Sequence, residues 1–133
     1  METVLRNIIT LSVTLHCPYD RAFEYLATPI NQKEWAIHFF RDIEEIDGKT
    51  IAVLPFGKLP MHIKSDYKTG ILDIHLGEGK PIHTRLIEID SNTNVYNFTL
   101  ARPKGMPDDV WKNKALPDMQ DELNILKRIL EEK

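Results

Sequence analysis

The sequence contains a single cysteine, Cys17, and so no disulfide within the chain, which favours a reducing compartment. No apolar run approaches the roughly 20 residues of a membrane-spanning helix. Residues 1–7 carry charges of both signs instead of a signal-peptide pattern. The net charge is −3, without the excess of lysine and arginine that nucleic-acid binders show. We therefore expect a cytoplasmic protein that neither spans a membrane nor binds nucleic acid.

The chain also has no internal repeat and no low-complexity tract. Its 133 residues fit one domain of ordinary size. A chain of this length buries about two-thirds of its unfolded surface without needing a metal ion. The fractions of hydrophobic (42%) and charged (28%) residues are typical of a globular protein. We expect a single domain over residues 1–133.

A strand and two short helices are predicted near the start of the chain. Residues 9–15 alternate between apolar and polar side chains, which is the pattern of a strand with one buried face. Pro18 suits the start of a helix over residues 19–27, and Thr28-Pro29 ends that helix. A second, shorter helix follows over residues 31–35.

Strands and turns then alternate as far as residue 103. The expected strands cover residues 43–46, 49–54, 61–68, 71–76, 82–89 and 95–100. Asp47-Gly48, between the first two of them, is a strong signal for a two-residue hairpin. The other connections are also short, which predicts an antiparallel meander.

Side-chain chemistry predicts how the strands over residues 71–76 and 82–89 pair. A three-residue loop at 78–80 places Asp73 opposite Arg85 and His75 opposite His83 on one face of the sheet. The other face of the central strands is then apolar, and a slip of one residue would mix the two faces. A sheet with one apolar face is covered on one side only.

The cover is a helix at the end of the chain. Apolar residues recur there at spacings of three and four residues: Leu116, Met119, Leu123, Leu126 and Leu130. Residues 107–111 are expected to form a separate short helical turn, and the sequence leaves open whether Pro117 kinks one helix or separates two. The predicted fold is α+β, with a curved antiparallel sheet of six or seven strands around a long C-terminal helix and two short helices after the first strand.

Three segments carry a family resemblance: Ser-Val-Thr-Leu at 12–15, Cys-Pro-Tyr-Asp-Arg-Ala-Phe-Glu-Tyr-Leu at 17–26 and Asn-Gln-Lys-Glu-Trp at 31–35. With the order of the elements, they resemble the START-like helix-grip superfamily of polyketide cyclases and dehydrases, birch-pollen-allergen proteins and lipid-transfer START domains. The resemblance implies a helix-grip fold with a cavity between the concave face of the sheet and the last helix. It does not fix an activity, because this fold hosts enzymes, carriers and co-chaperones.

The resemblance also implies that side chains of the inner sheet face and the last helix line the cavity. These side chains are Trp35, Phe39, Met61, Ile63, Tyr67, Leu72, Ile74, Leu86, Tyr96, Phe98, Met119, Leu123 and Leu126. Aromatic residues and methionines are typical of ligand cavities. Each of them has plain core packing as its alternative role, because the same alternation describes every half-buried sheet.

Glu88 is the first candidate for acid–base chemistry. It falls on the predicted inner face beside Tyr96, where burial would favour the neutral carboxyl group and allow proton transfer at neutral pH. In the alternative, a bulge after Leu86 turns Ile87 and Ile89 inward and sends Glu88 to solvent.

Tyr67, on the same inner face, and His38, near the cavity mouth, are the other acid–base candidates. The alternative for His38 is a surface loop. His62, His75 and His83 cluster on the predicted outer face, where three imidazoles are enough to bind zinc. That face is exposed to solvent, and no carboxylate is placed to orient the imidazole rings. We therefore expect a solvated histidine cluster and no metal site.

We expect the protein to bind a small hydrophobic or amphipathic ligand in the internal cavity, without a cofactor. Whether it is also an enzyme is left open. One alternative is a cyclase- or dehydrase-type enzyme that uses Glu88, Tyr67 or His38 as a proton carrier. Another is a co-chaperone-like interaction module, or a homodimer, if a solid core accompanies an apolar outer patch around Ile87 and Ile89.

Overall fold

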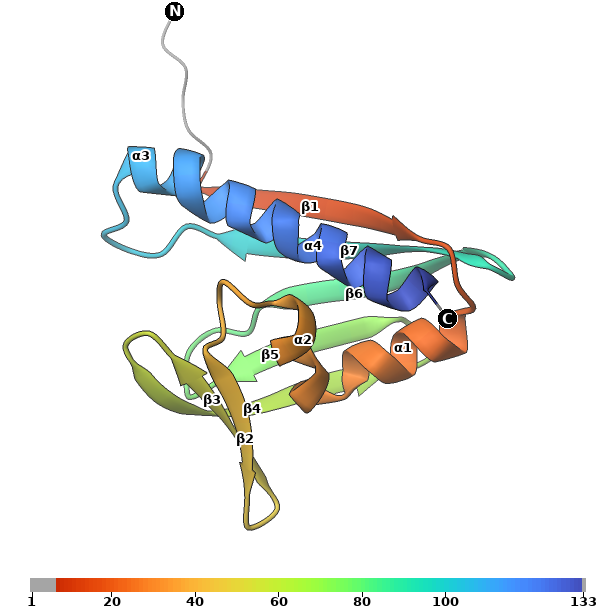
Figure 1. The fold of residues 1–133 in the computed structure, drawn as a ribbon, viewed down its shortest axis with the longest axis horizontal. Helices are drawn as coiled ribbons and strands as arrows, with labels where there is room; N and C mark the ends of the chain where they lie inside the picture. Colours follow the sequence, from red (N-terminus) through yellow and green to blue (C-terminus); the bar gives the residue numbers. More distant parts are fainter. Residues whose placement is uncertain (1–6, 133) are drawn as a thin grey trace, which may run out of the picture.

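The computed structural model describes residues 7–132 as a seven-stranded antiparallel sheet with helices on one side (Figure 1). The strands are β1 (Ile8–Leu15), β2 (Asp42–Ile46), β3 (Lys49–Leu54), β4 (Gly57–Asp66), β5 (Ile71–Leu76), β6 (His83–Asp90) and β7 (Thr93–Ala101). Their order in the sheet is β1-β7-β6-β5-β4-β3-β2, so the predicted meander is confirmed. β1 pairs with β7, and β1 and β2 form the two edges of an open sheet. The sequence showed no signal-peptide pattern in residues 1–7, and all of these except residue 7 lie outside the described residues.

The helices are α1 (Tyr19–Ala27), a 3-10 turn (Pro29–Asn31), α2 (Gln32–Trp35), α3 (Asp108–Val110), a π-helical segment (Trp111–Ala115) and α4 (Leu116–Glu131). Figure 1 shows α1, α2 and α4 on the same side of the sheet, with α4 running along β1 and β7. The predicted α+β helix-grip architecture is thereby confirmed. Within the described part of the chain, no helix is both long and apolar enough to cross a membrane.

The hydrophobic core lies between the sheet and these helices. Leu15, Leu72 and Leu86 of the sheet belong to one cluster with Leu123 and Leu126 of α4, and each is at most 1% exposed. Burial of one leucine side chain stabilises a fold by roughly 1.5–3 kcal/mol. The packing of α4 on the inner sheet face is therefore a main source of stability.

The Asp47-Gly48 hairpin is confirmed. Ile46 pairs with Lys49, and the two turn residues have φ angles of 52° and 78°. A two-residue turn of this type needs positive φ at both positions, which aspartate tolerates and glycine prefers. The turn therefore fixes the register of β2 and β3.

The predicted pairing of β5 with β6 is wrong by two residues. Ile74 N–H donates to Ile82 O at 2.9 Å, and Ile82 N–H donates to Ile74 O at 2.8 Å, so the connecting loop is longer than three residues. Pro81 has no N–H to contribute to the ladder. Gly77 turns the chain with a φ of 61° directly after β5. The turn at Gly77 begins the loop that leads to β6.

The slip of two residues keeps each side chain on its predicted face but changes its partner. Asp73 Oδ1 lies 3.1 Å from His83 Nδ1, whereas the sequence placed it opposite Arg85. His75 pairs with His62 of β4, and their rings stack with centroids 4.4 Å apart. No group of three or more histidine, cysteine, aspartate or glutamate side chains within residues 7–132 is arranged to hold a metal ion.

Pro117 lies in the first turn of α4, and the C-terminal helix runs through it. The π-helical segment joins α3 to α4, so residues 107–111 are not a separate turn. Leu116 N–H donates to the carbonyl of Trp111, five residues earlier, in place of the usual four. The wider turn accommodates a proline, which has no N–H and would crowd the carbonyl four residues before it.

Candidate functional site

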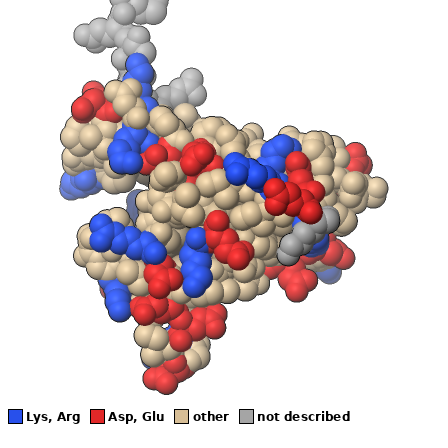
Figure 2. All heavy atoms as spheres, in the orientation of Figure 1, with Lys and Arg blue, Asp and Glu red and all other residues tan. Residues whose placement is uncertain are grey.

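A cavity of about 270 Å³ opens between the loop after α2, the end of β7 and the start of the C-terminal helix. Figure 2 shows the surface hollowed beside the helical segment at the upper left. The lining residues are His38, Phe39, Leu100, Pro103, Met106, Val110, Trp111, Lys114, Ala115, Asp118, Met119 and Glu122. We call this cavity the outer pocket.

Other hollows of the surface are less suited to a ligand. Three of them, of about 310, 410 and 600 Å³, are lined mainly by charged and hydroxyl-bearing side chains. Lysine and arginine alternate with aspartate and glutamate over the visible face in Figure 2. Small-molecule sites are predominantly apolar with a few placed polar groups, and the outer pocket fits that description best.

A second, enclosed space of about 20 Å³ lies deeper, between the sheet and α4. It shares Phe39, Leu100, Met119 and Glu122 with the outer pocket. The remaining lining residues are Gln32, Trp35, Ala36, Phe40, Ile74, Ile82 and Phe98. We call this space the inner end, because the two spaces have a common wall.

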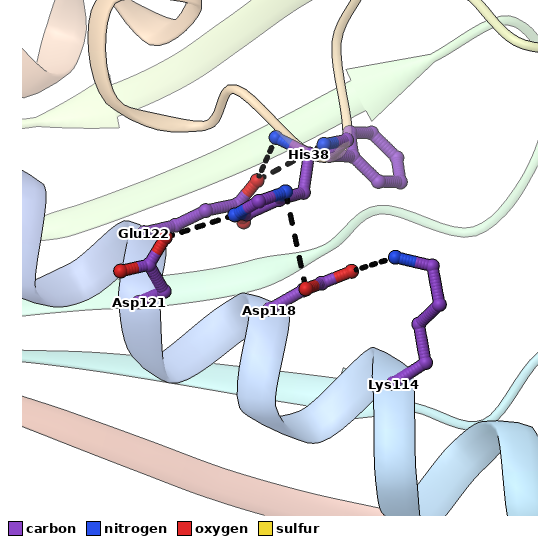
Figure 3. Close-up of polar contacts among 6 residues, drawn as sticks. His38, Lys114, Asp118, Asp121 and Glu122 are labelled. Carbon is purple, nitrogen blue, oxygen red and sulfur yellow. Dashed lines mark hydrogen bonds and ion pairs between the residues drawn. The ribbon is translucent and has the colours of Figure 1, made fainter.

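Glu122 is the central polar group of the site. Its side chain is buried, with 1% exposed, and its Oε2 accepts hydrogen bonds from the backbone N–H of His38 at 2.8 Å and of Phe39 at 3.0 Å (Figure 3). Burial raises the pKa of Glu122 to about 7, although the two backbone donors act in the opposite direction. Glu122 therefore changes charge near neutral pH, and it ties the loop after α2 to α4.

Charged side chains form the rim of the outer pocket. His38 Nε2 lies 2.9 Å from Asp121 Oδ2, and His38 Nδ1 lies 3.8 Å from Asp118 Oδ1. Lys114 Nζ lies 2.7 Å from the other oxygen of Asp118, one helical turn away (Figure 3). The hydrogen bond to Asp121 raises the pKa of His38. These ion pairs lie at the surface and contribute little to stability. They do hold the side chains of the rim in fixed positions relative to one another.

Twelve of the thirteen predicted pocket residues divide into two groups. Trp35, Phe39, Ile74, Phe98 and Met119 line the outer pocket or the inner end. Met61, Leu72, Leu86, Tyr96, Leu123 and Leu126 are buried in the core, and Ile63 is half-buried against it. These seven lie outside the lining of both spaces. The pocket thus lies nearer to one end of the sheet than the sequence suggested.

Tyr67 is placed differently from the prediction. It follows the last residue of β4, is 53% exposed and packs its ring against Tyr19 and Phe23 of α1. Its hydroxyl donates to Asp20. Because β4 ends two residues earlier than expected, Tyr67 lies at the surface and away from the outer pocket.

Glu88 is exposed as well, so it is not the desolvated carboxylate that the sequence suggested. It pairs with Asn94 of β7, and the irregularity in the strand falls between Glu88 and Asp90 instead of after Leu86. Ile87 and Ile89 therefore stay outside, 37% and 59% exposed. His38, the third candidate, does lie at the mouth of the outer pocket.

Glu122 was not among the candidates that the sequence interpretation named. A signal was present: Glu122 lies three residues after Met119 and four before Leu126, on the apolar stripe of that helix. The two backbone N–H groups that stabilise its carboxylate come from a loop more than eighty residues away. No local pattern indicates such a contact.

No family model matches the sequence, and no curated protein matches it. Solved structures do share its fold. The Zhui aromatase/cyclase from Streptomyces sp. R1128 is 12% identical, with a TM-score of 0.67 and 93% of each chain covered. A START superfamily protein from Mycobacterium smegmatis is 9% identical, with a TM-score of 0.69, covering 93% of this chain and 97% of that one.

The Aha1 dimer from Colwellia psychrerythraea is 16% identical, with a TM-score of 0.65, covering 93% of this chain and 96% of that one. Identities this low show a common fold and leave the ligand and the activity undetermined. The chain therefore has the START-like fold of the polyketide aromatase/cyclases, with the outer pocket at one end of its C-terminal helix.

Proposed function

We propose that this protein binds a small hydrophobic or amphipathic molecule in the outer pocket. The observation that carries the proposal is the pocket itself, a mostly apolar cavity of about 270 Å³ with one buried carboxyl group, Glu122, on its wall. Ligand sites are typically apolar cavities of roughly 300–1,000 Å³ with a few polar groups that fix orientation. The volume lies just below that range, which favours a small ligand with two or three aromatic rings.

Filling the outer pocket is expected to abolish this binding. Ala115 lines the pocket from the π-helical segment, so Ala115→Trp would place an indole in the ligand's space. We expect the variant to bind the neutral fluorescent probe N-phenylnaphthylamine at least about ten-fold more weakly than the unchanged protein, since a filled cavity leaves no apolar surface for the probe to cover. Probe fluorescence measures the affinity, and native mass spectrometry measures the stoichiometry.

Ala101→Trp is the matched control. Ala101 is exposed at the end of β7 and is not part of the pocket wall, so the same substitution there should leave probe binding unchanged. Circular dichroism establishes that both variants are folded. Equal affinities for the two variants, or no binding by the unchanged protein, would contradict the proposal.

Glu122 supports a second candidate, an acid–base enzyme of the cyclase or dehydrase type. A general acid or base works best when its pKa is close to the operating pH, and burial brings the pKa of Glu122 to about 7. One of the solved structures with this fold is an aromatase/cyclase. Glu122→Gln separates the two candidates: a binding protein keeps its affinity for an uncharged ligand, whereas an enzyme of this type loses turnover.

Self-association through the outer sheet face is a third candidate. Ile71 and Ile87, each 37% exposed, and Ile89, 59% exposed, leave apolar surface on β5 and β6 uncovered. An Aha1 protein with this fold was solved as a dimer. If this chain dimerises through that face, Ile89→Lys should convert a dimer into a monomer in sedimentation equilibrium. A monomeric unchanged protein would rule the candidate out.

A further inference from the structure

We propose that the inner end is a hydrogen-bonding subsite for an uncharged carbonyl oxygen of the ligand, with Trp35 Nε1 as the donor. The inference rests on the proposed function and specifies its ligand class: an aromatic or aliphatic ketone, aldehyde or ester whose apolar body lies in the outer pocket.

The first observation is an unpaired donor. Trp35 is 1% exposed, and its indole Nε1–H has no hydrogen-bond partner among residues 7–132. Buried polar groups in folded proteins are almost always paired, because an unpaired one costs roughly 1–3 kcal/mol. An indole nitrogen can only donate, so the group that satisfies it must be an acceptor.

The second observation is a small space that has Trp35 on its wall. Trp35 lines the inner end together with Gln32 and Glu122, which are 2% and 1% exposed. The volume of about 20 Å³ is enough for one oxygen-sized group and not for a ring. The indole also packs edge-on against Tyr96, with ring centroids 6.2 Å apart, which restricts its rotation.

The third observation is the shared wall. Phe39, Met119 and Glu122 line both spaces, so a ligand in the outer pocket lies next to the inner end. Phe39 is anchored through its backbone N–H to Glu122, which leaves its side chain as the part that can turn aside. A ligand that fills the outer pocket can then direct one atom towards Trp35.

Glu122 selects against a negatively charged ligand head. Ionised Glu122 would repel a carboxylate at the inner end, and desolvation disfavours any unpaired ion there. A neutral carbonyl oxygen accepts the Trp35 hydrogen bond without either cost. Protonated Glu122 has an O–H of its own, so it can act as a second donor to the same oxygen.

The test compares methyl naphthyl ketone with isopropenylnaphthalene, which has a CH₂ group where the ketone has its oxygen. Displacement of N-phenylnaphthylamine gives both affinities. The unchanged protein should bind the ketone about ten-fold more tightly, because the hydrocarbon leaves the Trp35 donor buried and unpaired. Trp35→Phe should weaken the binding of the ketone and not that of the hydrocarbon, so the ratio of the two affinities should fall to about one.

The possible failures are distinguishable. If both compounds bind equally to the unchanged protein, the subsite is wrong and the proposed function stands. If neither compound binds, the proposed function fails for this ligand class and the subsite fails with it. A purely structural role of Trp35 would weaken both compounds equally in Trp35→Phe, which also contradicts the subsite.

A measurement on the unchanged protein covers the case in which Trp35→Phe does not fold. The chain has two tryptophans, Trp35 and Trp111, so its ¹H–¹⁵N spectrum contains two indole signals, which Trp111→Phe assigns. The Trp35 indole proton should move downfield with the ketone and not with the hydrocarbon. The same shift with both compounds, or none with the ketone, would overturn the proposal.

Discussion

Glu122→Gln is expected to make the protein more stable at neutral pH, by about 3 kcal/mol, and to leave its stability near pH 4.5 unchanged. The carboxyl group has an ordinary pKa of 4.5 and a folded-state pKa of about 7, because it is buried. It therefore contributes stability that is fully present below pH 4.5 and lost as the pH rises through 7, when the buried group must ionise. The difference between the two pKa values corresponds to about 3 kcal/mol.

Glutamine avoids this loss because it never ionises and still offers a carbonyl oxygen to the backbone N–H groups of His38 and Phe39. Urea unfolding of both proteins between pH 4.5 and 7.5 measures the effect. Asp121→Asn is the matched control on the same helix. Asp121 is exposed and bonds to His38, so this variant should not be more stable than the unchanged protein at any pH. Parallel stability curves for Glu122→Gln and the unchanged protein would show that folding does not raise the pKa of Glu122.

Gly70→Ala is expected to destabilise the protein by about 4 kcal/mol or more and to lower its Tm by more than about 10 °C. Gly70 has a φ of 77°, and a Cβ atom there would lie 1.9 Å from the carbonyl oxygen of Leu86. That contact is to backbone, and Leu86 N–H donates to Gly70 O at 2.8 Å, so the two segments cannot separate without losing a hydrogen bond. Differential scanning calorimetry measures the change.

Gly48→Ala isolates the contribution of the contact. Gly48 has a φ of 78°, almost the same as Gly70, but nothing lies within 4 Å of the Cβ position. Alanine at Gly48 therefore adds only the backbone strain of a left-handed conformation, about 1–2 kcal/mol. If the two variants melted at the same temperature, the close approach of the turn after β4 to β6 would be wrong.

The sequence predicts the fold well where the controlling residues are neighbours. The Asp47-Gly48 turn and the alternation in β1 are local signals, and both give the correct structure. The pairing of β5 with β6 was wrong because hairpin length depends on which backbone groups can pair. Ile74 pairs with Ile82 instead of Thr84, a register shift of two residues that leaves every face unchanged.

The candidate site was less predictable, since it is built from long-range contacts. Trp35, Phe39 and His38 were identified and lie at the pocket. Glu122 was not, because its environment is created by the loop after α2, which only the folded chain brings onto α4. Glu88, the strongest polar candidate from alternation alone, lies near the end of β6 and is exposed.

The π-helical segment before Pro117 bears on how this pocket changes between related sequences. A π-helical turn holds one residue more than the regular helix needs. Deleting one residue from 111–115 would therefore let a regular α-helix form while the turns on either side keep about their present orientation. Val110, Met119 and Glu122 would keep their places, and only the wall that the π-helical segment contributes would change. That wall of the pocket is thus free to diverge through single-residue deletions, whereas the inner end is held by the core.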